Sequence, residues 1–459
     1  MNVGDTFTAP VETLVYGGDG LARIDGRVVF ISETAPGDTV RFRVTAVKKN
    51  FARAIPLEII SPSPDRIAPC CRVTDPDTGQ LTRVPGCVYD HISYPAELAA
   101  KHQQLCGFIR RIIRNEDEKI RNWELGVRNE NTETPATAAS TTSSVPCCNQ
   151  VPVAAFTPPR SPQLLIPNSQ FLIPPVPLHY RNKITLHLQQ GRLGYRQDPG
   201  HRVLDISACP LARPELNALL ATLHESGAFR ALPDGTDIVL RHTPHDGAIW
   251  WSQSPGHSVS ADAPMLTEQS PAGLMLVPRD GFYQVNPAVG DALVRAAQAW
   301  FTQIPDTPEL LDLYCGVGVF GLACLKAAPT RLTGIESGRA AIDAARLNAK
   351  ALGLRATFQC AALGQRDRFD PRRYLGEPSR AACIVDPPRE GLAPSVAAAL
   401  AASGIRRILY VSCDPATLTR DLAILLRGGY RLVSVRLFDM FPRTAHFETI
   451  AELELAARG

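Results

Sequence analysis

The stretch ELLDLYCGVGVFG at residues 309–321, followed by RLTGIE at 331–336, decides the fold of this chain. An apolar run of strand length leads into Gly316-Val317-Gly318-Val319-Phe320-Gly321, which fits the pattern G-x-G-x-x-G and opens a helical segment. Glu336 stands at the end of the next apolar run, at the spacing typical of nucleotide-binding βαβ units. The stretch therefore predicts the first half of an open, parallel α/β sheet.

The same alternation continues toward the end of the chain and predicts the rest of that sheet. Strand-like runs occur at 310–315, 331–336, 381–386, 407–413, 430–438 and 446–455. Segments with helical spacing separate most of them, which favours a doubly wound, mainly parallel arrangement. We expect a Rossmann-like domain over residues 286–459.

With 459 residues, the chain exceeds the usual size of one domain. Its formal net charge of +3 is too small to identify a partner, although a basic face is compatible with it. The N-terminus has no signal-like apolar segment, and no run of about 18 apolar residues occurs. These features predict a cytoplasmic protein, in which the 12 cysteines favour metal binding or catalysis over disulfides.

Residues 1–62 alternate apolar and polar positions in short runs separated by glycine-rich turns, as at Gly17-Gly18-Asp19-Gly20. This pattern predicts a small, OB-like β-barrel. The basic residues Arg41, Arg43, Lys48, Lys49 and Arg53 lie near Phe42 and Phe51. Such a mixture suits RNA binding through phosphate contact and base stacking, and a solvated basic strand face is the alternative.

Residues 63–285 are expected to form a cysteine-bearing segment and a middle α/β domain. A helix is predicted at about 95–114, and a strand pair at YRNKITLHLQQGRLGYR around Gly191. Between them, the composition at about 125–168 predicts a disordered insert, so Cys147 and Cys148 receive no structural role.

The glycine-rich loop predicts a site for a nucleotide-like cofactor. Glycines let the backbone approach the ligand, and a carboxylate at the position of Glu336 accepts hydrogen bonds from ribose hydroxyls. Asp386 begins Asp-Pro-Pro-Arg at the end of a later strand, at the sheet edge where ligands bind. The loop alone does not separate S-adenosylmethionine from NAD, and a tight turn without ligand is a third possibility.

Cys413 ends the run ILYVSC and precedes Asp414-Pro415 and a helix. Amide groups at a helix start favour a thiolate, so we expect a nucleophile here. A buried cysteine that acts only as a small apolar side chain is the alternative.

Five motifs together resemble the RNA 5-methyluridine (uracil-C5) methyltransferases, a class I, S-adenosylmethionine-dependent family that carries an N-terminal TRAM domain. They are YRNK at 180–183, FYQVN at 282–286, DPPREG at 386–391, YVSCDPATLTRDL at 410–422 and DMFPRTAHFET at 439–449. The resemblance covers nearly the whole chain. It implies that a methyl group is transferred to C5 of a uridine in RNA.

The resemblance also implies roles for single residues. Cys413 is then the nucleophile that adds to C6, and Glu448 is the base that removes the C5 proton. Taken alone, Glu448 would be an outward carboxylate on a terminal strand. The cofactor-binding positions are Gln284, Tyr314, Gly316, Gly318, Glu336 and Asp386. Apolar residues at Val319 and Ala362 depart from the polar ones of some family members.

The implied partner is RNA that presents a flipped or single-stranded uridine, because a thiol cannot reach C6 inside a stack. Ribosomal RNA is favoured over transfer RNA, and a monomer without membrane contact is expected. Three alternatives remain: a methyltransferase with another nucleophile class, an RNA-binding protein that has lost catalysis, and an NAD-dependent dehydrogenase.

Members of the family often hold a [4Fe-4S] cluster on four cysteines. By resemblance, Cys71, Cys87 and Cys209 are three ligands, but Val84 stands where the remaining cysteine is expected. Cys70 is available as a fourth thiol. Two interpretations remain open, namely a cluster and a set of buried thiols without metal.

Overall fold

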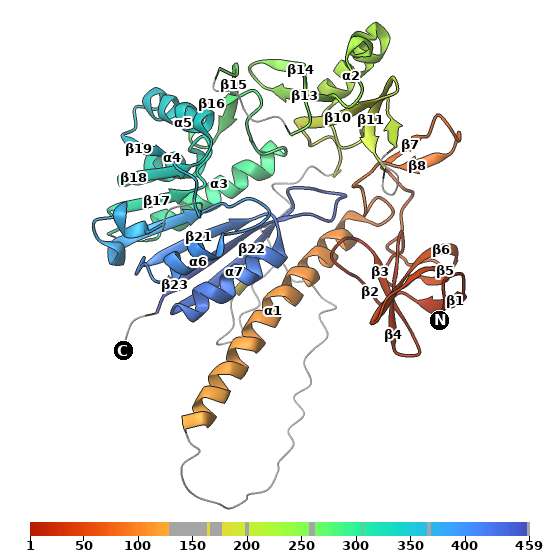
Figure 1. Ribbon diagram of the computed structural model, residues 1–459, viewed down its shortest axis with the longest axis horizontal. Helices are drawn as coiled ribbons and strands as arrows, with labels where there is room; N and C mark the ends of the chain where they lie inside the picture. The colour runs from red at the N-terminus through yellow and green to blue at the C-terminus, as the bar shows by residue number, and fades with distance from the viewer. Residues whose placement is uncertain are drawn as a thin grey trace, which may run out of the picture.

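One sheet of eight strands organises the C-terminal part of the protein in a computed structural model (Figure 1). The structure describes residues 1–127, 163–165, 177–197, 202–256, 262–304, 306–364 and 369–456, without the side chains of 113–127 and 163–165. The strand order is β19-β18-β17-β20-β21-β23-β22-β9. The strands are β9 (Gln163–Leu165), β17 (Glu309–Leu313), β18 (Arg331–Glu336), β19 (Ala356–Cys360), β20 (Ala381–Val385), β21 (Arg407–Ser412), β22 (Tyr430–Phe438) and β23 (Glu448–Leu455).

Strands β17 to β21 are parallel, whereas β23 runs antiparallel to both β21 and β22. The chain starts at β17 and winds outward in both directions, so the predicted doubly wound, Rossmann-like sheet is confirmed. Strand β19 was not expected as a separate element. Most of its residues are exposed, which explains why the sequence carries little apolar signal there.

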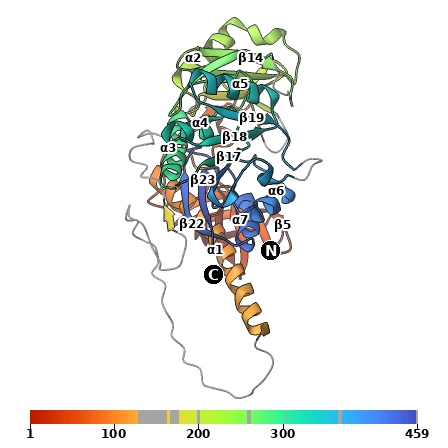
Figure 2. The same ribbon diagram turned by 90° about the vertical axis from the view of Figure 1, so that its left-hand side faces the viewer.

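Helices cover both faces of this sheet (Figure 2). One apolar layer joins the sheet to α3 (Pro287–Thr302), α4 (Val319–Ala327) and α5 (Arg339–Ala351). The other joins it to α6 (Pro394–Ala401), α7 (Pro415–Arg427) and the N-terminal helix α1 (Tyr94–Val127). Short 3₁₀ turns occur at Pro371–Arg373 and Pro378–Arg380. Helix α1, predicted at about 95–114, is longer than expected at its C-terminal end.

The N-terminal residues form the predicted barrel, a six-stranded sheet of order β1-β5-β6-β4-β3-β2. Alternate residues of β5 point into its core, as the period of a strand requires. Phe42 is one of them and is fully buried, so the expectation that it stacks on a base is wrong. The strands are β1 (Thr6–Pro10), β2 (Thr13–Leu14), β3 (Gly20–Ile24), β4 (Arg27–Ile31), β5 (Thr39–Val47) and β6 (Phe51–Ser61).

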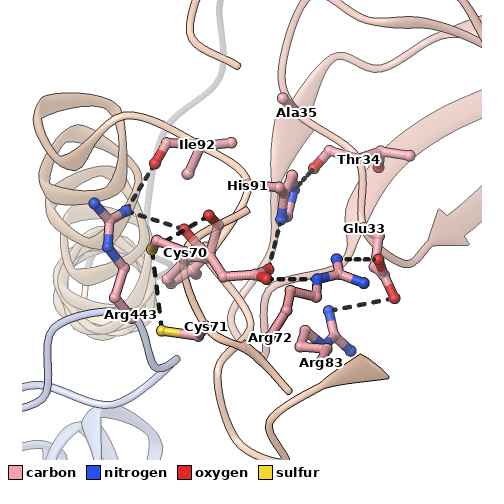
Figure 3. A network of polar contacts seen from close by, with 12 residues as sticks. Glu33, Thr34, Ala35, Cys70, Cys71, Arg72, Arg83, His91, Ile92 and Arg443 are labelled. Carbon is pink, nitrogen blue, oxygen red and sulfur yellow. Dashed lines mark hydrogen bonds and ion pairs between the residues drawn. The ribbon is translucent and has the colours of Figure 1, made fainter. Parts of the chain in front are cut away.

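Ion pairs fix the barrel to the segment that follows it. Arg66 donates to both carboxylate oxygens of Asp38 at 2.8 Å. Figure 3 shows Arg72 reaching Glu33 of the barrel, at 2.7 Å, while its Nε donates to Asp90 at 2.9 Å. The segment contains a small ribbon of β7 (Arg72–Thr74) and β8 (Leu81–Arg83).

The middle region is a five-stranded antiparallel sheet of order β12-β11-β10-β13-β14, with α2 packed against it. The expected strand pair turns at Gly191, whose φ of +74° suits glycine. The elements are β10 (Lys183–Gln189), β11 (Arg192–Arg196), β12 (Val203–Asp205), α2 (Pro214–Ser226), a 3₁₀ turn at Ala228–Ala231, β13 (Asp237–Thr243) and β14 (Gly247–Gln253). A ribbon of β15 (Met265–Ser270) and β16 (Gly273–Pro278) then leads to α3.

The insert expected at about 125–168 lies outside the described residues except at its two ends. There, α1 extends to Val127, and Gln163–Leu165 pair with β22 as β9. Cys147 and Cys148 are likewise outside the described part. Within that part, no helix has both the length and the apolar character needed to cross a membrane.

Candidate active site

A pocket lies at the carboxyl edge of the large sheet, beside the glycine-rich loop. Gly316 has a φ of +53°, and a Cβ placed there would meet no atom within 4 Å, so the glycine leaves room for a ligand. Gly318, with a φ of +86°, is the N-cap of α4. Of the residues predicted to bind cofactor, the pocket is lined by Gln284, Tyr314, Gly316 and Asp386.

The remaining predicted acid, Glu336, lies at the end of β18 next to the loop. Its Oε2 accepts a hydrogen bond from the Gly316 amide at 3.4 Å, and its Oε1 accepts one from Gly338 at 2.7 Å. The carboxylate therefore has the position expected for contact with a ribose. Val319 also lines the pocket, so the apolar departure from the family pattern is part of the site.

Burial makes Asp386 a weak acid at the wall of this pocket. It raises the pKa of Asp386 to about 7, and the charge of Glu336 acts in the same direction. A neutral acid at the wall would become ionised next to a cation, because an opposite charge stabilises the carboxylate. The Asp386 carboxyl group therefore fits a cofactor that carries a positive centre, as S-adenosylmethionine does at its sulfonium.

The structure brings Cys413 and Glu448 close together. Ser412, directly before Cys413, pairs with Thr449, directly after Glu448, in the antiparallel register of β21 and β23. The charge of Glu448 acts on the Cys413 thiol. Asp386 follows β20, the other neighbour of β21, and its charge also acts on the Cys413 thiol. The three side chains therefore form one group, although Cys413 and Glu448 are 35 residues apart in the sequence.

The expectation that helix-start amides favour a Cys413 thiolate is wrong for the protein without substrate. Burial raises the pKa of Cys413 to about 12, and the charges of Glu448 and Asp386 add to this effect. The amides at the start of α7 are used by Asp414, whose Oδ1 accepts from Ala416 at 2.9 Å and Thr417 at 3.0 Å. The capping carboxylate thus offsets the positive end of the helix.

Glu448 is 5% exposed, and burial raises its pKa well above the ordinary value of 4.5. Asp386 also raises it, whereas Arg389 lowers it. A raised pKa makes the ionised carboxylate a stronger proton acceptor than a solvated glutamate is.

Several site residues were not singled out from the sequence. Arg389 lies close enough to lower the pKa of Cys413, Glu448 and His446. His446 is two residues before Glu448 and contacts Tyr16 of the barrel. Arg389 belongs to the motif DPPREG and His446 to DMFPRTAHFET, so the sequence could have indicated both. No sequence motif indicated Tyr16, because 430 residues separate it from His446.

The loop that leads to Glu448 is held by buried polar contacts. Lys101 of α1 donates to Glu97 and to Asp439 at 2.7 Å each, and to the Phe441 carbonyl at 3.2 Å. Arg443 donates to the carbonyls of Tyr89 and Ile92, as Figure 3 shows for Ile92. Helix α1 therefore fixes the approach to the catalytic strand.

The four candidate cluster cysteines lie in one region. Cys71, Cys87 and Cys209 are buried in the same apolar cluster as Val84, and Cys70 packs against it. The sulfurs of Cys70 and Cys71 are 4.0 Å apart (Figure 3). Across the described residues, no group of three or more His, Cys, Asp or Glu side chains is arranged to hold a metal ion. The iron–sulfur centre therefore stays a prediction.

Two family models match the chain. Residues 275–455 match the tRNA (Uracil-5-)-methyltransferase model, and residues 1–57 match the TRAM domain. In overall fold the chain is similar to Pyrococcus abyssi tRNA (uracil-54, C5)-methyltransferase, solved with S-adenosyl-L-homocysteine. That comparison gives a TM-score of 0.62 at 22% identity and covers 97% of this chain and 99% of the other.

Sequence similarity to individual relatives extends over nearly the whole chain. It is 31% identical to the 23S rRNA (uracil(1939)-C(5))-methyltransferase RlmD of Pectobacterium atrosepticum, over 97% of this chain and 93% of that protein. It is 30% identical to an uncharacterized RNA methyltransferase of Thermosynechococcus vestitus, over 98% of both. The chain therefore belongs to the RNA (uracil-C5)-methyltransferase family.

Proposed function

We propose that this enzyme methylates C5 of a uridine in RNA, with Cys413 as nucleophile and Glu448 as base. The observation that carries the proposal is that the ends of β21 and β23 bring the Cys413 thiol near the buried Glu448 carboxyl group, whose charge acts on the thiol. Uracil C5 is too weak a nucleophile to accept a methyl group unaided, so the reaction needs a group that adds to the ring and a group that removes a proton.

In the proposed reaction, the thiol of Cys413 passes its proton to water, and its sulfur bonds to C6. The electron pair of the C5–C6 double bond moves onto C5 and O4, and C5 then accepts the methyl group. Glu448 takes the proton from C5, the S–C6 bond breaks, and the double bond forms again. Because the resting thiol has a pKa of about 12, attack requires that substrate binding or a base shifts this proton.

S-adenosylmethionine, when bound, supplies the methyl group from its sulfonium centre. Gln284, Tyr314, Asp386 and the backbone at Gly316 and Gly318 would hold it in the pocket, and Glu336 would meet its ribose. The loop fits such a ligand because only a residue without Cβ leaves the space at Gly316 open.

The substrate we favour is ribosomal RNA rather than transfer RNA, on the strength of the RlmD relative. The uridine must be flipped out or single-stranded to reach Cys413. In this proposal, residues 1–62 bind RNA, residues 63–285 shape the pocket and residues 286–459 carry out the transfer. Both reacting groups come from one chain, in keeping with a monomer, and we place its action in the cytoplasm as part of the same proposal.

The test uses RNA transcribed with 5-fluorouridine, whose C5 fluorine cannot leave as a proton and so traps the covalent complex. Native protein with S-adenosylmethionine should form an SDS-stable RNA adduct. Cys413→Ala should form none and should lose methyl transfer by more than about 10³-fold. Glu448→Gln should still form an adduct on ordinary uridine RNA but fail to release it.

Cys360→Ala is the matched control, because it removes an exposed thiol at the end of β19. It should behave as the native protein does. Undiminished uridine methylation by Cys413→Ala would refute the proposed nucleophile.

A further inference from the structure

A side chain of the N-terminal barrel lies at the catalytic group. Tyr16 occupies the turn between β2 and β3, which is closed by hydrogen bonds from Val15 to Asp19 at 2.9 Å and from Gly18 to Val15 at 3.0 Å. A Cβ on Gly18 would come within 2.6 Å of Val88, so the turn packs tightly against the segment after the barrel. Helix α1 adds a hydrogen bond from Gln104 to the Leu14 carbonyl at 3.2 Å. The turn is therefore held from two sides.

From this fixed turn, Tyr16 extends to the strand that carries Glu448. Its hydroxyl lies 3.4 Å from Nδ1 of His446. Its ring makes edge contacts with Phe108 of α1 at 5.8 Å and with Phe447 at 6.0 Å between centroids. The barrel thus touches the two residues directly before Glu448.

The surrounding charges place Tyr16 beside the reacting groups as well. Burial raises its pKa, the charges of Asp414 and Cys413 raise it further, and Arg389 lowers it. The phenol therefore stays protonated and can donate a hydrogen bond. Burial and the charge of Arg389 lower the pKa of His446, so its imidazole is neutral and offers an acceptor nitrogen.

We propose that Tyr16 is a positioning residue for uridine methylation, through its hydrogen bond to His446. The bond orients His446 and, through the short stretch to Glu448, fixes the base near Cys413. Displacements of about 1 Å at a reacting group can cost on the order of 10²-fold in rate. The barrel would then act on the chemical step in addition to holding RNA. This inference rests on the function proposed above.

Tyr16→Phe tests the idea because it removes the hydroxyl and keeps the ring contacts. We expect the single-turnover methylation rate at saturating RNA to fall about 10-fold, with the dissociation constant for RNA and the melting temperature unchanged. His446→Phe removes the same contact from the other side, because it keeps a ring and has no ring nitrogen. The double variant should be no slower than the slower single variant, since coupled residues are not additive.

Tyr374→Phe is the control, because it removes the hydroxyl of another half-buried tyrosine, one stacked on Phe369. It should keep the native rate. If Tyr16→Phe keeps the native rate, or changes only RNA affinity, the inference is wrong while the proposed function stands. If native protein forms no adduct with 5-fluorouridine RNA, the proposed function itself fails.

Discussion

At the scale of single residues, the site is shaped by the energetic cost of burying charge. Asp312 lies below the glycine loop, fully buried at the end of β17. Its Oδ2 accepts a hydrogen bond from the Gly321 amide at 3.0 Å, and its Oδ1 has no partner among the described residues. Burial raises the pKa of Asp312 from 3.8 to about 8, with Asp386 and Glu336 acting in the same direction.

This pKa predicts a pH-dependent stability. The folded protein favours the protonated acid, so stability falls as pH rises from about 4, where the unfolded group titrates, to about 8. Asp312→Asn removes the titration and keeps an oxygen for the Gly321 amide. We expect the free energy of unfolding, measured with urea, to rise by about 1–3 kcal/mol at pH 8 and to change little at pH 5.

Asp343→Asn on α5 should show the opposite trend, because a hydrogen bond from Arg339 lowers the pKa of this exposed acid. An equal loss of stability for Asp312→Asn at both pH values would contradict the assignment of a raised pKa.

At the scale of elements, α1 links the first third of the chain to the catalytic strand. Its residues Glu97 and Lys101 are fully buried and meet Asp439 and Arg443 of the loop before β23. Apolar residues farther along α1, from Leu105 to Ile112, join the layer that contains α6 and α7. One helix therefore contacts both the segment that follows the barrel and the loop before Glu448.

Lys101→Met should destabilise the protein strongly, since it leaves two buried carboxylates without their cation. Removal of one partner of a buried ion pair typically costs about 3–5 kcal/mol. Chemical denaturation followed by circular dichroism gives the value. Lys350→Met, at an exposed position of α5, should stay within about 0.5 kcal/mol of the native protein. A similarly small effect of Lys101→Met would show that the network adds little to stability.

At the scale of the whole molecule, the barrel presents basic side chains that differ in their surroundings. Arg41 is paired with Glu58 at 2.7 Å, and Arg53 with Asp19 at 3.0 Å. Arg43, Lys48 and Lys49 are exposed and make no ion pair among the described residues. These three are better placed than Arg41 and Arg53 to contact phosphates, because they need not break an ion pair with a carboxylate first.

Replacement of Arg43, Lys48 and Lys49 together by alanine should weaken RNA binding about 10-fold or more near 0.1 M salt. The slope of log affinity against log salt should also become shallower, since fewer counterions are released. Filter binding over a salt series measures both quantities. Arg41→Ala should have a smaller effect, and equal losses in the two variants would mean that overall charge, not these positions, matters.

Local sequence determined most of the large sheet and the barrel. The glycine loop, the apolar strand runs and the alternating barrel strands follow from spacing between neighbours, so they could be predicted. Strand β19 was missed because it lies at the sheet edge and is largely solvated. The sequence also placed Cys413 and Glu448 as a pair, but only by resemblance, and their proximity follows from the pairing of the neighbouring residues Ser412 and Thr449.

Tertiary structure alone decided which distant residues are in contact and how the pKa values of buried groups are shifted. The contact of Tyr16 with His446 and that of Glu97 with Arg443 join segments more than 300 residues apart, and no local pattern encodes them. The raised pKa of Cys413 likewise reverses what its helix-start position predicted. Desolvation and through-space charge depend on everything packed around a group, and packing is a property of the folded chain as a whole.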